Sequence, residues 1–116
     1  MIIEPKDRKV DASEHKWGGY GTTITKTIVE TSSLPHCRVF GVIELEPGSG
    51  IGYHVHNNEA EVYYILEGRA KVNDNNEKEC ILKPGDTLQT NDGMGHSIEA
   101  VGEETLKFVA VVITNG

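Results

Sequence analysis

The sequence is poor in positive charge. Only 11 of its 116 residues are lysine or arginine, against 18 aspartate and glutamate residues, so the formal net charge is −7. The basic residues form no run, whereas proteins that bind nucleic acid through its phosphates usually carry a basic patch. We therefore expect neither nucleic acid nor an anionic membrane among its partners.

Long apolar runs, a signal peptide and paired cysteines are also missing. The apolar stretch at residues 109–113 is far shorter than the roughly 20 residues that cross a bilayer. The first eight residues lack the basic and then apolar order of a signal peptide. Cys37 and Cys80 form no Cys-x-x-Cys pair, so we expect free thiols rather than a disulfide framework or a zinc site. These absences predict a cytoplasmic protein.

No segment has a convincing helical period over eleven or more residues. Short β-type runs, rich in Thr, Ile, Val and aromatic residues, instead alternate with turn sequences such as Glu-Pro-Gly, Lys-Pro-Gly-Asp and Asn-Asp-Gly. A chain of this length forms one domain with one modest core. The pattern predicts an all-β sandwich or barrel with strands at residues 22–30, 39–46, 61–66, 69–73, 78–82, 87–90, 97–101 and 106–113.

The last of these strands is apolar on both faces. Leu106, Phe108, Ala110 and Val112 share one face, and Val109, Val111 and Ile113 form most of the other. Such a strand needs cover on both sides, either inside a two-layer sandwich or at a subunit interface on the outer layer. We expect a homodimer, although an interior strand explains the same pattern.

Three of the five histidines have a spacing that suits metal binding. His54 and His56 are two residues apart, so both rings project from one face of a strand. Glu61 opens the next predicted strand, and a turn between the two strands would bring it beside them. His96 begins another strand just after an Asn-Asp-Gly turn. We predict that these four side chains share one space, the alternative being solvated histidines on a strand edge.

Three neutral imidazoles and one carboxylate would form a mixed nitrogen and oxygen ligand set. This set suits Mn²⁺, Fe²⁺, Co²⁺, Ni²⁺ or Zn²⁺ and is too rich in nitrogen for Ca²⁺ or Mg²⁺. Four protein ligands leave up to two positions of an octahedral ion open to water, a substrate oxygen or dioxygen.

The spacing of these residues resembles the two motifs of the cupins. The first motif matches at Gly48, His54, His56, Glu61 and Gly68, and the second at Gly85, Gly93 and His96. The resemblance covers residues 48–96 and departs from the family at Asn91, where proline is usual, and at Ala100, where asparagine is common. It implies a double-stranded β-helix, or jelly roll, with a barrel over residues 22–113, an N-terminal arm and loop over residues 1–21, and one metal ion inside.

Acid or base residues are harder to assign. Glu59 competes with Glu61 as the carboxylate ligand, but Glu61 fits both the strand parity and the family spacing, which leaves Glu59 as a turn residue or an acid/base group. Tyr53 and Tyr63 are further catalytic candidates, because a phenol from either could point into the cavity. Residues 17–21 form either a lid or an anchored loop, and His15 and His36 are expected at the surface.

The resemblance leaves the activity open, because this fold serves many reactions. The leading hypothesis is a manganese- or iron-dependent lyase or dioxygenase acting on a small carboxylate or dicarbonyl compound, similar to oxalate-degrading cupins. The alternatives are a sugar-phosphate isomerase, for which clustered basic residues are not evident in the sequence, and a non-catalytic module that binds a metal and a small ligand.

Overall fold

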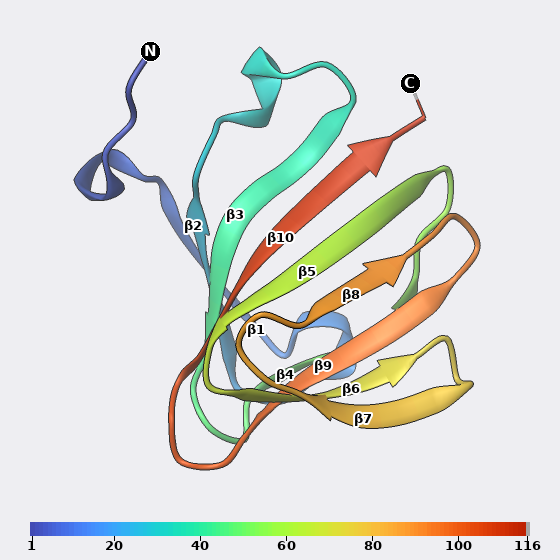
Figure 1. Ribbon diagram of the computed structural model, residues 1–116. Coiled ribbons are helices and arrows are strands. Elements are labelled where there is room, and N and C mark those ends of the chain that lie inside the picture. The colour runs from blue at the N-terminus through green and yellow to red at the C-terminus, as the bar shows by residue number, and fades with distance from the viewer. Residues whose placement is uncertain (116) are drawn as a thin grey trace.

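The computed structural model describes residues 1–115 and is built almost entirely of strands (Figure 1). The strands confirm the all-β prediction, and the three helical segments are single 3-10 turns. The strands are β1 (Val10–Glu14), β2 (Thr22–Thr27), β3 (Cys37–Leu45), β4 (Gly50–Val55), β5 (Glu59–Glu67), β6 (Arg69–Asp74), β7 (Lys78–Leu82), β8 (Thr87–Thr90), β9 (Gly95–Val101) and β10 (Leu106–Thr114), and the turns are η1 (Pro5–Asp7), η2 (Lys16–Gly18) and η3 (Thr31–Ser33).

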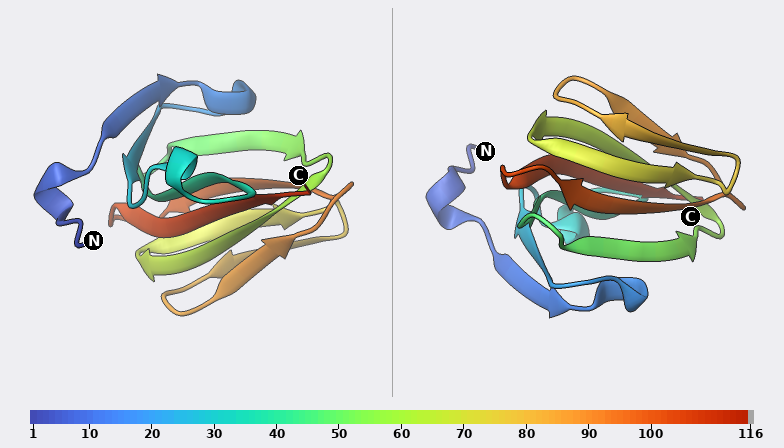
Figure 2. Two further views of the ribbon diagram at one scale, coloured as in Figure 1. Left: turned by 90° about the horizontal axis from the view of Figure 1, so that it is seen from above. Right: turned by 90° about the horizontal axis from the view of Figure 1, so that it is seen from below.

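Two antiparallel sheets form the layers of the jelly roll. The larger sheet has the strand order β1-β2-β3-β10-β5-β8, and the smaller sheet has the order β4-β9-β6-β7. Figure 2 shows the N-terminal segment, in blue, curving around one side of the molecule. Several neighbouring strands, such as β3 with β10 and β4 with β9, come from distant parts of the chain, so the fold brings the two halves of the predicted ligand set together.

The core lies between the sheets and follows the period-two pattern of the strands. On β10, Leu106, Phe108, Ala110 and Val112 are buried at 0–1% exposure, as the sequence predicts. The opposite face of β10 is less covered, and Ile113 is 49% exposed. The strand is therefore interior within its sheet, between β3 and β5, while its second apolar face points out of the sandwich.

The predicted N-terminal arm contains one strand that the sequence pattern did not indicate. β1 pairs with β2 along its whole length, from Val10 opposite Lys26 to Glu14 opposite Thr22. All five residues of β1 are exposed, so no buried side chain produces an alternating apolar pattern. Backbone pairing at the sheet edge holds this strand in place.

Glycines allow η2 to lie directly on β4. A side chain at Gly52 would collide with the backbone carbonyl of Trp17, and one at Gly19 would collide with the carbonyl of Gly50. Of the glycines before His54, Gly52 is required by this contact with η2, whereas a side chain at Gly50 would meet the backbone of Ile98 on β9. This contact places the segment after His15 beside the predicted metal ligands.

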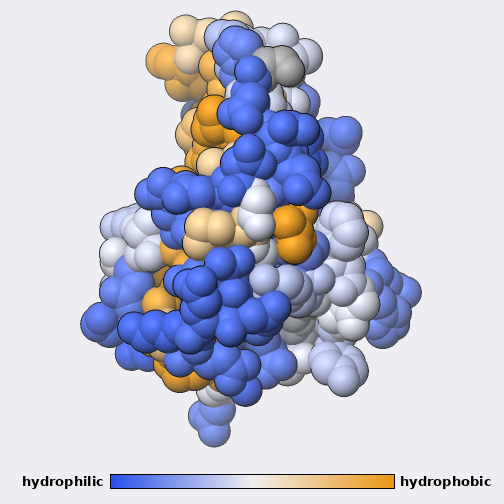
Figure 3. Space-filling view, turned by 90° about the vertical axis from the view of Figure 1, so that its right-hand side faces the viewer, coloured by the Kyte–Doolittle hydropathy of each residue, from blue (hydrophilic) through white to orange (hydrophobic). Residues whose placement is uncertain are grey.

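The surface seen in Figure 3 is mostly hydrophilic, with hydrophobic residues mainly along its left side and a smaller group near the middle. Within residues 1–115, no helix has the length and apolar character needed to cross a membrane.

Candidate metal centre

The four predicted ligands come from β4, β5 and β9 and the turn between the first two. His54 lies on β4 directly opposite His96 on the neighbouring strand β9. His56 follows β4, where its backbone N–H donates to Met94 and its carbonyl accepts from Gly93, at 3.0 and 2.7 Å. These bonds tie the two motif loops together, so residues 40 positions apart in the sequence converge.

The loop before His96 makes the bend that its sequence predicts despite the absence of proline. The N–H of Met94 donates to the carbonyl of Asn91 at 3.0 Å, and Gly93 has a positive φ of 83°. Asp92 accepts a hydrogen bond from the N–H of Asn58 at 2.7 Å and so fastens this loop to the first motif. Ala100, the other departure from the family pattern, is buried in the core.

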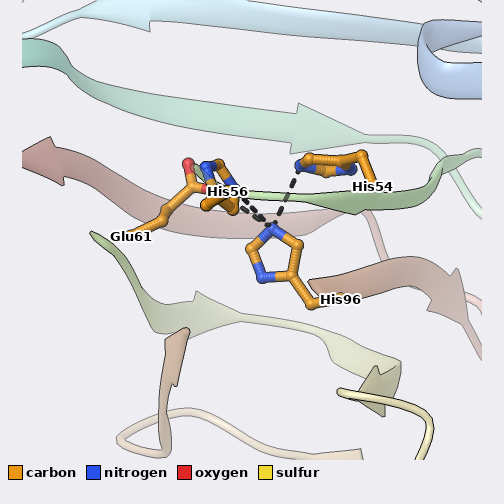
Figure 4. Close-up of side chains that lie close together, drawn as sticks. All are labelled: His54, His56, Glu61 and His96. Atoms are coloured by element: carbon orange, nitrogen blue, oxygen red, sulfur yellow. Dashed lines mark hydrogen bonds and ion pairs between the residues drawn. The ribbon is translucent and has the colours of Figure 1, made fainter. Parts of the chain in front are cut away.

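The candidate ligand atoms of the four side chains lie close together and face a common space (Figure 4). The Nε2 atom of His96 lies 3.1 Å from Nε2 of His54 and 3.2 Å from Nε2 of His56. The Oε1 atom of Glu61 lies 2.9 Å from Nε2 of His56 and 3.0 Å from Nε2 of His96. All four candidate ligand atoms lie within 4.8 Å of one another, which is the arrangement that one shared ion would require.

Each histidine is oriented by a hydrogen bond at its outer nitrogen, and the sequence alone did not reveal these partners. His54 Nδ1 lies 2.8 Å from the carbonyl of Gly52, and His56 Nδ1 lies 2.6 Å from Oε2 of Glu59. His96 Nδ1 lies 2.7 Å from the hydroxyl of Thr90, a fully buried residue of β8. Such contacts fix the ring and its tautomer in metal sites.

These partners determine which ring nitrogen carries the proton. A carbonyl and a carboxylate only accept hydrogen bonds, so the neutral rings of His54 and His56 are protonated at Nδ1 and expose a bare lone pair at Nε2. The Nε2 atom of His56 faces the Glu61 carboxylate oxygen at 2.9 Å, and the Nε2 atom of His54 faces Nε2 of His96 at 3.1 Å. Converging acceptors without donors repel one another, and a divalent transition metal satisfies all of them. The donor set therefore fits such an ion.

The pKa of Glu61 is set by the histidines that surround its carboxylate. Burial alone would raise the pKa of Glu61, but hydrogen bonds from His56 and His96 outweigh it and lower the pKa to about 2. The hydrogen bond with Glu61 raises the pKa of His56 more than burial lowers it. His54 is more isolated from carboxylates, and burial lowers its pKa. Glu61 and His56 therefore favour each other's charged form.

A cavity of about 240 Å³ opens onto the site. Its walls include the candidate ligands His54, His56 and Glu61, together with apolar side chains from both sheets. Lys16 and Trp17 of η2 form part of its rim, and the Trp17 ring stacks on His54 with centroids 5.0 Å apart and planes 11° apart. The N-terminal loop is thus both anchored to β4 and part of the cavity wall.

The three acid/base candidates occupy different positions. Tyr63 lines the cavity and stacks on His96, with ring centroids 4.7 Å apart. Burial, with the charge of Glu61, raises the pKa of Tyr63 well above 10, so its phenol stays protonated. Glu59 lies on the outer side of His56, and Tyr53 packs against Gly95 outside the cavity lining.

Glu59 is also bound on its other side by Arg38. The guanidinium donates from Nε to Oε1 at 2.9 Å and from Nη2 to Oε2 at 2.7 Å. This bidentate pair, more than the hydrogen bond to His56, lowers the pKa of Glu59. The carboxylate is therefore ionised and held in place, which favours an orienting role toward His56. His15 and His36 are exposed, as expected.

Comparison with known proteins gives a consistent family relationship. Residues 41–112 match the family model described as Cupin domain. A protein of Thermotoga maritima named oxalate-binding protein is 33% identical over 114 residues, covering 97% of this chain and 93% of that protein. The crystal structure of a predicted oxalate decarboxylase from T. maritima has a TM-score of 0.92 at 33% identity, covering 98% of this chain and 99% of that one.

A third match is more distant. The crystal structure of a Klebsiella pneumoniae protein with a double-stranded β-helix domain has a TM-score of 0.73 at 25% identity, covering 99% of this chain and 90% of that one. The family model spans well over half of the sequence, and the T. maritima relatives match almost from end to end. The sequence motifs, the jelly roll and the converging histidines agree with these matches: the chain belongs to the cupin family.

Proposed function

We propose that this cupin binds one divalent transition metal, manganese or iron, through His54, His56, Glu61 and His96, and that the metal site takes a small carboxylate of the oxalate type. The observation that carries the proposal is the convergence of three histidine nitrogens and one carboxylate oxygen at a cavity of about 240 Å³. Zinc, nickel and cobalt suit the same ligands. The names of the T. maritima relatives support oxalate as the first ligand to test.

The size and lining of the cavity agree with a small ligand. At about 240 Å³ the cavity is smaller than the roughly 300–1,000 Å³ of pockets that hold drug-sized ligands, and apolar side chains such as Ile43, Ile51 and Val112 line it beside the predicted metal ligands. When bound, the metal would supply Lewis acidity to the oxygens of a chelating carboxylate. The chain's own contribution is to hold the ligand beside Tyr63 and away from bulk water.

We further propose that the chain is an enzyme, either a lyase or a dioxygenase. Tyr63 is the acid/base candidate that this proposal favours, because it lines the cavity and its raised pKa keeps a proton on its hydroxyl. Glu59 is proposed to orient His56 rather than to reach the ligand. Tyr53 has the weakest claim, because its ring lies against Gly95.

Calorimetric titration with oxalate tests this function. Protein loaded with Mn²⁺ or Fe²⁺ is expected to bind about one oxalate per chain, whereas metal-free protein should bind none, because the ligand oxygens need the metal. Incubation of the loaded protein with oxalate, with and without dioxygen, then separates turnover from binding. Formate and carbon dioxide without oxygen would indicate a lyase, and stable binding with no product would favour a non-catalytic module. Failure of the loaded protein to bind oxalate or malonate would contradict the proposal.

A homodimer through the outer face of the larger sheet is proposed as the assembly. Tyr64 and Leu66 on β5 are 45% and 40% exposed, and Ile113 on the adjacent strand β10 is 49% exposed. Val109 and Val111 continue this apolar face between them. Sedimentation at micromolar concentration is expected to give twice the chain mass, and Val111→Glu should give the monomer. A monomeric native protein would contradict this assembly.

We also propose a cytoplasmic location, which the two free cysteines support.

A further inference from the structure

Lys16 stands at the junction of two cavities. It lines the metal cavity together with Trp17, and it also lines an adjacent cavity of about 270 Å³ that contains Lys9. Within residues 1–115, no carboxylate oxygen lies at ion-pair distance from its ammonium group, although other lysines near this end of the chain have such partners. A half-buried, unpaired cation at the rim of a ligand cavity is available to an anionic ligand.

The other cation of the metal cavity is already neutralised. Both carboxylate oxygens of Glu59 accept hydrogen bonds from Arg38, at 2.9 and 2.7 Å. This pair contributes no net charge to a ligand in the cavity, and its geometry shows that Arg38 is held toward Glu59. Lys16 is therefore the unpaired positive side chain among the residues that line the metal cavity.

The backbone fixes the place of Lys16 relative to the metal centre. The N–H of Gly19 donates to the carbonyl of Lys16 at 3.0 Å, and the next residue, Trp17, stacks on His54. The close backbone contact between Trp17 and Gly52 fastens the same turn to β4. Lys16 therefore belongs to an anchored turn, next in sequence to a residue that stacks on one of the proposed metal ligands, and it lines the same cavity.

The net charge of the metal-loaded site indicates which class of ligand it would bind. A divalent ion contributes +2, Glu61 contributes −1, the Arg38–Glu59 pair contributes zero, and Lys16 contributes +1. On this basis, which rests on the proposed function, we propose that Lys16 makes the metal site selective for doubly charged anions over singly charged ligands of the same shape. Lys16 raises the net charge that the ligand meets from +1 to +2, the charge that a dicarboxylate neutralises.

Oxalate and oxamate provide the test, because an amide replaces one carboxylate in oxamate and the shape is nearly unchanged. The Coulomb energy is proportional to the ligand charge, so Lys16→Met should weaken oxalate binding by about tenfold and oxamate binding by about threefold. Lys9→Met is the matched control, because it changes the net charge equally but Lys9 lines the adjacent cavity and not the metal cavity. The Nζ atom of Lys9 lies 4.0 Å from a carboxylate oxygen of Asp11. The dissociation constant of oxamate divided by that of oxalate should fall about threefold in Lys16→Met and stay constant in Lys9→Met.

Calorimetry on Mn²⁺-loaded protein, with the metal content of each variant measured first, gives these constants. An unchanged ratio in Lys16→Met, or an equal change in Lys9→Met, would overturn the role of Lys16 while leaving oxalate binding itself intact. If the loaded native protein binds neither ligand, the proposed function fails and this proposal falls with it. Lys16→Arg keeps the positive charge and should retain the native ratio of the two dissociation constants. A change of this ratio in Lys16→Met but not in Lys16→Arg is therefore an effect of charge.

Discussion

Replacing His96 with alanine is expected to lower the affinity for manganese or iron by about 100-fold or more, because one of four ligands is removed from the centre of the cluster. The Nε2 atom of His96 lies within 3.2 Å of a ligand atom of His54, His56 and Glu61. No other ligand atom of the cluster makes all three contacts. Metal content, measured by plasma mass spectrometry on protein purified without chelators or a nickel column, should fall from near-stoichiometric to trace.

A second variant separates loss of metal from loss of structure. His96 is fully buried, stacks on Tyr63 and is hydrogen-bonded to Thr90, so its removal also weakens the core. His54 is only half-buried, and His54→Ala should lose the metal while the circular dichroism spectrum of the strands is kept. Full metal content in either alanine variant would show that the ligand assignment is wrong.

Glu59→Gln provides a graded comparison within the same experiment. Glutamine keeps the size of the side chain and an accepting oxygen, but it loses the charge that supports the N–H of His56. Changes to such orienting partners typically cost about 10–100-fold in metal affinity. An effect between those of the native protein and His96→Ala is expected. A loss as complete as in His96→Ala would contradict a purely orienting role for Glu59.

The ligand set could be predicted from the sequence because its signals lie in the spacing of residues along the chain. His54 and His56 share a strand parity, and the family spacing fixes Glu61 and His96 relative to them. The all-β fold followed in the same way, from short alternating runs separated by turn residues. In each case the information lies in spacing along the chain, which is visible without coordinates.

The orienting groups could not be predicted, since they depend on contacts between sheets and on backbone atoms. Thr90 reaches His96 from β8, a strand of the other sheet, and Gly52 contributes only its carbonyl. Arg38 is 21 residues before Glu59, and nothing in its sequence context indicates the pair. The position of Trp17 depends on backbone contact at glycines, which no hydrophobic pattern records. Tertiary structure therefore contributes most of what determines how the metal would be held.

Acidification is expected to release the metal in a step separate from unfolding. The hydrogen bond with Glu61 holds the pKa of His56 above its ordinary value of 6.5, so protons compete for its Nε2 at a higher pH than for a free imidazole. Affinity should fall by about tenfold per pH unit while one proton competes, and more steeply as further histidines are protonated. His54 joins later, because burial lowers its pKa. Metal occupancy across pH 8 to 4, measured after equilibrium dialysis, tests this order.

The fold should outlast the metal as the pH falls. Protonation of His56 stabilises the metal-free protein below the unfolded pKa of about 6.5, because its folded pKa is raised. Glu61 acts in the opposite direction: its pKa falls from 4.5 to about 2 on folding, so its contribution is present above pH 4.5 and is lost as the pH falls toward 2. Metal loss near pH 6 with unfolding only below pH 4.5 is therefore expected. Full metal occupancy at pH 4.5 would contradict ligation by histidine, and simultaneous metal loss and unfolding would contradict the stabilising role assigned to protonated His56.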